Sequence, residues 1–538
     1  MPIRMTDDPA ESDESGGGFE SGGGGRNSGG GSSGGIFSLL PLLLGLIRGP
    51  KSLLLIVGLG IGAYFLLGRG GGGCNMDAVT QQVQQGLATG GFLDPKQFDK
   101  SKVYEPLSDD DGKNPLPESA NLQKYAPPVG DQGKQGSCGA WSSAYGARTV
   151  LEAARTGADP NSLKFSPAFL YNQIGLDGCQ GSYINRAMDY MSQKGSVPYE
   201  TFPYSDQDCS RQPDEQMLEK ARQYRMRGSN RLTVGDNTDK INLRAIKENL
   251  SQGAPVVIGM MVGGSYMQDM MGKDVWNPTQ DDQAQMGFGG HAQCVVGYDD
   301  AKYGGSFLIM NSWGPQWGVN GFAWVRYKHF LYFVREAYGL ESMPAVGAAA
   351  NKPFECEVGL VQVSFNGKKT VAGSYIPLKV SGANVFETTG AVKKGTRFKM
   401  EIRNQSECYI YVFGKETDGS SYTLFPYPKA GDLTKTKYSP FCGIAGYRLF
   451  PRDKSMEPDS IGVKDIMAVL VSRDSLNWSS LNEKISQNRS SDYATRVRTA
   501  LGSSAQFLSA DVSSNGNIHF KGEGAGNKIV ACIVEVNK

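Results

Sequence analysis

The sequence predicts an α+β protein with a helical lobe, then a β-rich lobe, then a mostly β C-terminal domain. Within residues 116–343, helical periodicity dominates up to about Gln252, and short runs of β-branched and aromatic residues follow it. A chain of 538 residues is long enough for two or three domains. Two lobes of different structure in one domain predict a cleft between them.

Residues 1–69 contain no predicted globular domain. Residues 1–35 are rich in Gly, Ser, Asp and Glu, and we expect them to be disordered because they carry too few apolar side chains to form a core. Residues 36–69 contain two apolar runs. Ile36–Ile47 is interrupted by Pro41 and is too short to cross a bilayer, whereas Ser52–Gly68 is uncharged and reaches about 25 Å as a helix.

These runs predict a membrane-anchoring segment at residues 36–69. Arg48 and Lys51 precede the second run and Arg69 follows it, which favours a single pass with the N-terminus inside. The rest of the chain would then lie outside the cytoplasm, in a bacterial cell envelope. A cleaved signal peptide is an alternative, although no Ala-x-Ala site follows, and a lipid-modified Cys74 is another.

Helices and strands follow in order within residues 116–343. A helix is expected from Cys138 to about Arg155, with Ala144, Ala147, Val150 and Leu151 on its apolar face. A second helix is expected at Asp239–Leu250. The strands expected after it are Pro255–Met260, Ala292–Tyr298, Ser306–Met310 and Gly321–Tyr327.

Residues 344–356 are predicted to be a linker, and residues 357–538 a β-rich accessory domain. Tyr409–Phe413 and Tyr422–Phe425 flank an Asp-Gly turn, which predicts a hairpin. A second hairpin is expected from Ile518–Phe520 and Lys528–Glu535, and a helix at about Asp492–Leu501. Binding of an unknown partner and structural support both remain open as roles of this domain.

The charge balance excludes one class of partner. The chain has 55 basic and 54 acidic residues, with no basic stripe and no interleaving of aromatic and basic residues. We therefore expect no nucleic acid partner.

The run Asp-Gln-Gly-Lys-Gln-Gly-Ser-Cys-Gly-Ala-Trp, from Asp131 to Trp141, suggests a nucleophile. It places Cys138 at the start of a helix, where the positive end of the helix dipole favours the thiolate, the form that attacks carbonyls. Gln132 lies shortly before it, and a side-chain amide donates a hydrogen bond to the oxyanion that such an attack creates.

A base and its orienting partner are found among the few histidines. The chain has three, and His291 lies where small residues lead into an apolar strand. Asn311 ends the next strand, and an asparagine carbonyl holds an imidazole in one tautomer. Trp313 would cover that hydrogen bond from water. His329 and His519 have no comparable setting and are interpreted as ordinary surface or strand residues.

These residues resemble the papain family of cysteine peptidases. The resemblance extends over Leu116 to Gly339 and includes elements similar to the family's Gly-Cys-Asn-Gly, Tyr-Pro-Tyr and Asn-Ser-Trp-Gly motifs, here Gly178–Gly181, Phe202–Tyr204 and Asn311–Gly314. It implies a papain-like two-lobed fold and hydrolysis of protein or peptide substrates. The C-terminal domain weakly resembles a β-rich bacterial domain of unknown function that is appended to peptidases.

By position, the resemblance implies Cys138 as nucleophile, His291 as base, Asn311 as its orienting partner and Gln132 as oxyanion donor. The implied substrate-binding residues are Gly181, Ser182, Tyr183, Ile184 and Trp313, with an apolar substrate side chain expected at the pocket wall. No metal or other cofactor is expected. A metal site at His291 and Cys294 is disfavoured because the two would face opposite sides of a strand.

The chain departs from the family pattern at three places. Gly139 follows the nucleophile where the family has Trp, and Gln135 replaces a customary disulfide cysteine. Residues 70–115 form a linker or short pro-like segment, too short for the usual inhibitory prosegment, so that any latency works differently. The first of these departures concerns the packing around the thiol and the primed-side surface, and the acyl chemistry is expected to be retained.

The remaining cysteines favour an oxidising compartment. Cys179 and Cys209 fall where the family stabilises its helical lobe with disulfides, and we expect them to pair with each other. Four more cysteines in the C-terminal domain allow three connectivities: Cys356, Cys408, Cys442 and Cys532.

The leading hypothesis is a membrane-anchored endopeptidase that forms an acyl-enzyme at Cys138. A transpeptidase or amidase with the same site is an alternative. A non-catalytic surface binding protein is another, although such proteins usually lose the nucleophile.

Overall fold

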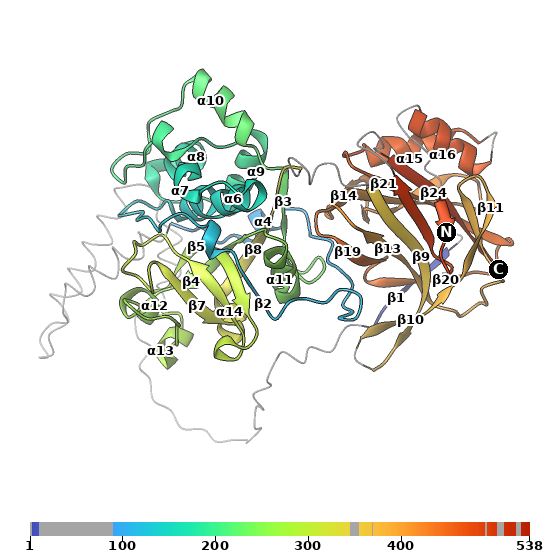
Figure 1. Ribbon diagram of the computed structural model, residues 1–538, viewed down its shortest axis with the longest axis horizontal. Helices are drawn as coiled ribbons and strands as arrows, with labels where there is room; N and C mark the ends of the chain where they lie inside the picture. Colours follow the sequence, from blue (N-terminus) through green and yellow to red (C-terminus); the bar gives the residue numbers. More distant parts are fainter. Residues whose placement is uncertain are drawn as a thin grey trace, which may run out of the picture. The chain divides into compact units, whose positions relative to one another are not determined.

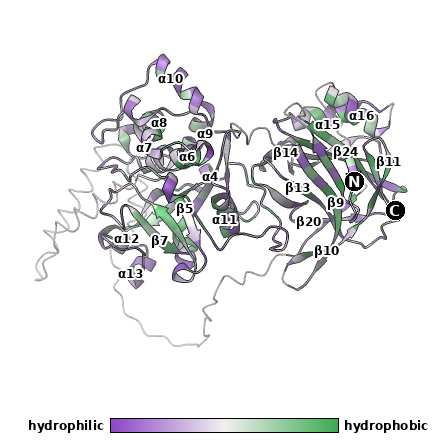
Figure 2. Cartoon of the chain, in the orientation of Figure 1, coloured by the Kyte–Doolittle hydropathy of each residue, from purple (hydrophilic) through white to green (hydrophobic). Residues whose placement is uncertain are grey.

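The computed structural model describes residues 3–9, 90–344, 354–367, 369–489, 492–502, 510–522 and 529–538 (Figure 1). The α+β class and the two-lobed first domain are confirmed. In Figure 2 the strands β5 and β7 are largely hydrophobic, whereas the peripheral helices α10 and α13 are largely hydrophilic. This contrast is expected when a buried sheet carries the core and short helices cover it.

The helical lobe is built around one continuous helical run. It comprises α5 (Cys138–Ala140), a π-helical stretch, η3 (Trp141–Arg148), and α6 (Thr149–Thr156), and it ends at Gly157 with a left-handed φ of 73°. The predicted helix is thus confirmed to within a residue at each end. The other α-helices of this lobe are α7 (Pro160–Leu163), α8 (Pro167–Ile174), α9 (Ile184–Gln193) and α10 (Glu215–Ala221).

The β-rich lobe is a sheet in the order β3-β8-β4-β5-β6-β7, with β2 paired to β5. The four predicted strands are confirmed as β4, β5, β6 and β7, and the helix predicted at Asp239–Leu250 is α11. The strands are β2 (Ser119–Asn121), β3 (Gly228–Arg231), β4 (Val256–Val262), β5 (Gly289–Asp299), β6 (Ser306–Met310), β7 (Phe322–Arg326) and β8 (Val334–Glu341). The helices are α11 (Leu243–Ser251), α12 (Gly264–Gln268), α13 (Gln280–Gln283) and α14 (Tyr327–Phe333).

The two lobes pack closely where the central helix meets the sheet. A Cβ atom added to Gly146 in η3 would lie 3.2 Å from Cβ of Cys294 on β5, so glycine permits the close approach. Ala144 and Ala147 on the same run are fully buried. Small residues on this face therefore place the start of the helix directly against the strand that carries His291.

The C-terminal domain contains two packed sheets. One has the order β1-β20-β13-β9-β23-β22, with β10 and β19 paired to its inner strands, and the other has the order β11-β12-β24-β21-β14-β15, with β18 paired to β14. Alternating residues of β14 separate two cores: Ile410 and Val412 face the other sheet, whereas Tyr411 and Phe413 pack with α15 (Trp478–Gln487) and α16 (Tyr493–Leu501).

The strands of this domain are β9 (Phe354–Phe365), β10 (Thr370–Ile376), β11 (Leu378–Gly382), β12 (Val385–Thr388), β13 (Phe398–Asn404), β14 (Cys408–Lys415), β15 (Ser421–Phe425), β16 (Pro428–Lys429), β17 (Asp432–Thr436), β18 (Phe441–Cys442), β19 (Gly446–Phe450), β20 (Lys454–Pro458), β21 (Lys464–Ser472), β22 (Ala510–Val512), β23 (Ile518–Gly522) and β24 (Ile529–Asn537). The hairpin predicted around Asp418 and Gly419 is confirmed as β14 and β15, and α16 confirms the predicted helix.

The second predicted hairpin is wrong. β23 pairs with β22 and β9 in one sheet, whereas β24 pairs with β21 and β12 in the other. The reason is burial on both faces: Val530, Cys532 and Val534 of β24 enter the core between the sheets, while Ala531 and Ile533 pack under the helices. A strand buried on both sides occupies the interior of a sheet rather than a local hairpin.

The expectation that all of residues 1–35 are disordered is also wrong at its start. β1 (Ile3–Asp7) pairs antiparallel with β20, with Met5 opposite Met456, and Ile3 is buried in the core between the sheets. Asp8 forms a buried ion pair with Lys399 at 2.5 Å and accepts a hydrogen bond from Ser455. The five residues of β1, together with the ion pair between Asp8 and Lys399, are enough to add an edge strand to this sheet.

The predicted membrane segment, residues 36–69, lies outside the described residues, as do residues 10–35 and 70–89. Among the residues that the structure describes, no helix is long and apolar enough to cross a membrane. Residues 90–115, which belong to the predicted linker or short pro-like segment, are packed against the folded unit. They include α4 (Pro95–Phe98), which Asp94 caps and which buries Phe98.

Candidate active site

Cys138 is the first residue of the central helix, as predicted, and it is fully buried. Its Sγ accepts a hydrogen bond of 3.4 Å from the backbone N–H of Ala292 on β5. Burial raises the pKa of the Cys138 thiol to about 12, although the N–H groups of Ala292 and Gly139 lower it. Burial therefore opposes the thiolate form that the helix start was expected to favour.

His291 and Asn311 come together because they lie on paired strands. β5 carries His291, β6 ends directly before Asn311, and the two strands are hydrogen-bonded neighbours. Nε2 of His291 lies 2.7 Å from Oδ1 of Asn311. The Trp313 ring stacks on the imidazole with centroids 4.3 Å apart and planes 23° apart, so it covers this hydrogen bond as anticipated.

The Gln132 side chain is buried and held from two sides. Its Oε1 accepts from Ser312 Oγ at 2.7 Å, and its Nε2 donates to the backbone carbonyl of Gln135 at 3.1 Å. Tyr204 donates to the Gln132 carbonyl at 2.7 Å. The amide therefore has a fixed orientation in the loop that leads to Cys138.

Gly139 follows the nucleophile where the papain family has Trp, and the surrounding structure explains this difference. A Cβ atom at this position would lie 2.5 Å from Oγ of Ser182, so a larger residue after the nucleophile would require Ser182 to shift. The Trp141 ring packs instead against Tyr145 and Tyr204, with ring centroids 4.7 and 4.9 Å away. The indole therefore supports the Gln132 loop through Tyr204 rather than standing next to the thiol.

An internal segment of the chain lies beside these residues. Phe92 N–H donates to the Ser182 carbonyl at 3.3 Å, and Ser182 N–H donates to the Gly90 carbonyl at 3.1 Å, which makes a parallel bridge between Gly91 and Ser182. On the other side, Gly91 N–H donates to the carbonyl of Gly290 at 2.9 Å. Residues 90–93, which we call the cleft segment, are thus bound through their backbone by both lobes.

The cleft is narrow where the cleft segment passes. A Cβ atom on Gly90, which has a φ of 66°, would overlap the backbone of Gly136, two residues before the nucleophile. A Cβ atom on Gly91 would lie 2.9 Å from the backbone of Gly290, next to His291. Only glycine fits at both positions without a shift of the neighbouring backbone, so the cleft segment lies against the backbone that flanks both catalytic residues.

The predicted substrate-binding residues divide into three groups. Ser182 binds the backbone of the cleft segment, Gly181 lies against it, and the Tyr183 ring is 5.8 Å from that of Phe92. Trp313 stacks on the imidazole, as described above. Ile184 begins α9 and is buried in the main core.

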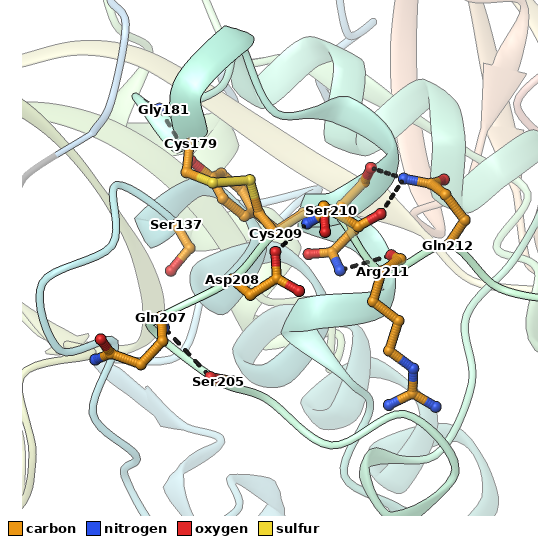
Figure 3. Close-up of a disulfide and its surroundings, with 12 residues drawn as sticks. Ser137, Cys179, Gly181, Ser205, Gln207, Asp208, Cys209, Ser210, Arg211 and Gln212 are labelled. Carbon is orange, nitrogen blue, oxygen red and sulfur yellow. Dashed lines mark hydrogen bonds between the residues drawn. A yellow bond between two sulfur atoms is a disulfide. The ribbon is translucent and has the colours of Figure 1, made fainter.

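The expected disulfide between Cys179 and Cys209 is confirmed, with Cα atoms 6.1 Å apart (Figure 3). The bridge ties the segment before Gly181 to a loop, in which Asp208 accepts from the backbone N–H of Ser210. It therefore supports the strip that binds the cleft segment. The four cysteines of the C-terminal domain, in contrast, are buried free thiols: Cys356, Cys408, Cys442 and Cys532.

The other two histidines take no part in this site. His519 on β23 pairs with Glu355 at 2.8 Å, and burial lowers the pKa of His329 on α14 to about 4. The described part of the chain contains no group of three or more His, Cys, Asp or Glu residues arranged to hold a metal ion.

Four contributors were not assigned a role from the sequence. The cleft segment acts through glycine backbone, which has no side-chain signal. The Ala292 N–H donates to the Cys138 sulfur, and the Ser312 hydroxyl donates to the Gln132 side chain. The only sequence signal for these two residues was that each directly follows an identified residue, His291 or Asn311. Tyr204 was noted only as part of a motif.

The site combines a thiol, an imidazole and an amide that come from two lobes. Beside them, the backbone of Ser182 binds an extended segment of chain. Such an arrangement can cleave peptide bonds with the sulfur as nucleophile. The fold and the site define a cysteine-type peptidase.

Comparisons with known proteins identify the family. Residues 116–347 match the family model described as papain family cysteine protease. Cathepsin K of Mus musculus is 29% identical over 252 residues, which are 46% of this chain and 70% of the relative. Pro-cathepsin H of Bos taurus is 29% identical over 217 residues, 39% of this chain and 60% of the relative. Residues 116–347 belong to the papain family of cysteine proteases.

Solved structures to which the chain is similar include xylellain, a cysteine protease from Xylella fastidiosa. It is 24% identical, the match covers 45% of this chain and 97% of that chain, and the TM-score is 0.36. Procathepsin L 3 of Tenebrio molitor larval midgut is 19% identical, with 57% and 97% covered and a TM-score of 0.38.

Proposed function

We propose that the protein is an endopeptidase that hydrolyses peptide bonds through an acyl-enzyme at Cys138. The observation that carries this proposal is the contact between the Cys138 sulfur and the strand of His291, whose ring is held by Asn311. The cleft segment lies inside the chain and not at a terminus, which supports cleavage within chains rather than at their ends.

The chemical steps follow from this geometry. With Nε2 of His291 held by Asn311, Nδ1 takes the thiol proton, and the Cys138 sulfur attacks the substrate carbonyl carbon. The Gln132 amide donates to the oxyanion that forms. The C–N bond then breaks, the amine leaves with the proton from His291, and a water molecule deprotonated by His291 hydrolyses the thioester.

We also propose that the structure represents a latent form. The cleft segment lies over the catalytic residues and burial keeps the thiol protonated. Its displacement would expose Cys138 and remove the desolvation that raises its pKa. A short glycine-containing segment would thus replace the larger prosegment that is usual in the family.

The Gln132→Ala variant is expected to lower kcat about 10²–10³-fold while changing KM little, because the amide acts on the oxyanion and not on the bound substrate. Steady-state kinetics with a fluorogenic peptide would measure both constants. A loss seen mainly in KM would make Gln132 a substrate contact.

Ser312→Ala is the matched control for this variant. It removes the hydroxyl that donates to Gln132 Oε1 but keeps the amide donor itself. We expect a fall in kcat of less than about tenfold, since one hydrogen bond of about 1 kcal/mol is lost. Equal losses in both variants would mean that Gln132 acts only through the structure of its loop.

The alternative acceptor, an amine in place of water, predicts a different product. Added amino-acid amide would be joined to the new carboxyl end of the amino-side product of a transpeptidase, and mass spectrometry of the digest would detect it. Absence of any turnover, with peptide still bound, would favour the non-catalytic binding protein.

We further propose that residues 36–69 attach the peptidase to a membrane, with the catalytic residues outside the cytoplasm. The apolar sequence of the segment and the Cys179–Cys209 disulfide support this arrangement. We expect the full-length protein to stay with membranes after washing at alkaline pH, whereas a chain that begins at residue 84 is released. Recovery of the full-length protein in the wash would exclude the anchor.

A further inference from the structure

The four free cysteines of the C-terminal domain lie in one core. Cys356, Cys408, Cys442 and Cys532 are each at most 2% exposed, and all belong to the apolar core between the two sheets. The sequence alone leaves three ways to join them in pairs. The strand register decides which of them a disulfide can join, because the two Cα atoms must lie about 4.4–6.8 Å apart.

Cys408 and Cys442 lie directly opposite each other. Cys408 begins β14, Cys442 ends β18, and the two residues are partners in antiparallel register. The Ile410 N–H donates to the Pro440 carbonyl at 3.0 Å, two residues further along each strand. Since the two kinds of pair alternate along a ladder, Cys408 and Cys442 also form a hydrogen-bonded pair, with Cα atoms about 5.5 Å apart. Their backbone separation is therefore suited to a disulfide.

Cys532 is too far from this pair. It lies on β24, and β21 separates that strand from β14. Val469 of β21 pairs with Cys532 on one side and with Val412 of β14 on the other, so Cys532 is level with Val412. The two strand spacings amount to about 10 Å, and the offset from Val412 to Cys408 adds about 13 Å along the strand.

Cys356 lies on the opposite sheet. Its strand, β9, pairs with β13 and β23, whereas the other three cysteines belong to the sheet that contains β14. Packed sheets are about 10 Å apart. Cα atoms separated by more than about 7 Å cannot be bridged without backbone movement. Cys408 and Cys442 are thus the pair of this domain that the fold holds ready to be joined.

We propose that Cys408 and Cys442 form a cross-strand disulfide when the chain folds under oxidising conditions, whereas Cys356 and Cys532 remain thiols. The oxidant is a disulfide of a second molecule. One cysteine thiolate attacks it, which releases one thiol and leaves a mixed disulfide, and the other cysteine thiolate then displaces the second thiol. One S–S bond forms in the chain, and the oxidant takes up two electrons and both thiol protons.

The exchange takes place while β18 is detached from β14. Burial raises the pKa of Cys442 to about 11 and that of Cys408 well above its usual range, although the Arg448 guanidinium lowers both. The closed domain therefore disfavours the thiolate that the exchange requires. Since β18 has only two residues, it can separate from β14 during folding or in a local opening of the folded chain.

The bond would close a loop that contains β15, β16 and β17 and would fasten β18 to β14. The same loop holds the chain that follows the cleft segment: Ser439 N–H donates to the Val103 carbonyl at 3.0 Å, and Val103 N–H donates to the Lys437 carbonyl at 2.6 Å. The disulfide should therefore stabilise the domain together with this attachment. None of these steps depends on peptidase activity.

The test uses the full-length Cys138→Ala chain, which cannot digest itself. The chain is incubated with oxidised glutathione until Cys179 and Cys209 resist alkylation, and it is then unfolded, alkylated without reduction and digested with trypsin. We expect mass spectrometry to find peptides 404–415 and 438–448, which contain Cys408 and Cys442, joined to each other.

In the same digest Cys356 and Cys532 are expected to carry the alkyl group. Alkylation of Cys408 and Cys442, glutathione attached to either of them, or a bond from either to another cysteine overturns the proposal. Cys442→Ala should leave Cys408 alkylated. Cys532→Ala is the matched control, since it removes a thiol from the same core, and it should leave the two peptides joined.

The melting temperature measures what the bond does. Reduction also breaks the bond between Cys179 and Cys209, so the natural chain is compared with Cys442→Ala, each with and without dithiothreitol. We expect reduction to lower the melting temperature of the natural chain by about 5–15 °C more than that of the variant. Equal falls in both chains would overturn the stabilising role of the bond.

Discussion

Replacement of Cys138 by alanine is expected to reduce peptide hydrolysis by about 10⁴-fold or more, because no other group near His291 can form the acyl-enzyme. The variant should keep its fold, since alanine fills a buried position at the start of a helix without a polar atom to satisfy. Hydrolysis of a fluorogenic peptide and the circular dichroism spectrum would measure the two effects. Activity within tenfold of the natural chain would remove Cys138 from the mechanism.

Cys294→Ala provides the matched control for the nucleophile. Cys294 is also fully buried on β5, and burial raises its pKa, but it faces Gly146 of the helix rather than the cleft. We expect its loss to change hydrolysis less than about threefold, with at most about 1–2 kcal/mol of stability lost to the smaller side chain. A comparable loss of activity would indicate that any core cysteine is required for folding.

Replacement of Gly90 by valine is expected to raise activity about 100-fold. A side chain at this position overlaps the backbone of Gly136 and disfavours a φ of 66°, and such strain costs about 2–3 kcal/mol. Since the strain exists only while the cleft segment is bound, the equilibrium shifts by about two powers of ten toward the open form. Initial rates of hydrolysis and of Cys138 alkylation should rise together.

Gly390→Val serves as the control for the cleft segment. Gly390 has open space around its Cβ direction and no left-handed φ, so valine there should change neither rate. If Gly90→Val left both rates unchanged, the cleft segment would not restrict access, and the covered thiol would need another explanation.

The residues of the candidate site could be predicted because each of them is marked by the sequence immediately around it. Cys138, His291 and Asn311 each stand at the boundary of a helix or strand that apolar periodicity defines, and the strands carrying the last two are neighbours in both sequence and sheet. Gln132 was identified from its position shortly before Cys138 and from the resemblance to the papain family. The fold of the first domain was predictable for the same reason.

What the sequence did not reveal depends on contacts between distant backbone segments. Gly90 and Gly91 bind through N–H and carbonyl groups that every residue possesses, so nothing distinguishes them from the other glycines nearby. Alternating side chains of β24 enter two different cores. In the sequence, a strand that is buried on both faces looks the same as any other run of apolar residues. The burial that raises the pKa of the Cys138 thiol also depends on the folded structure and has no signal in the sequence around the cysteine.

The N-terminal strand restricts how the chain can be arranged at a membrane. Residues 3–8 complete the sheet that contains β20, and Asp8 is the acidic partner of the buried Lys399. An amino terminus on one side of a bilayer cannot pair with a domain on the other. A chain that leaves this sheet after Asp8 and returns at Gly90 must therefore cross the bilayer an even number of times, or not at all, whereas the sequence favoured one crossing.

The two arrangements exclude each other, and Met5 and Met456 offer a direct measurement because they are partners in register. Cysteines placed at both positions would form a disulfide in intact cells only if the amino terminus and the catalytic unit share one compartment. A disulfide there would place the amino terminus and the catalytic unit on the same side of any membrane that residues 36–69 reach. Loss of the amino-terminal strand would expose the edge of β20.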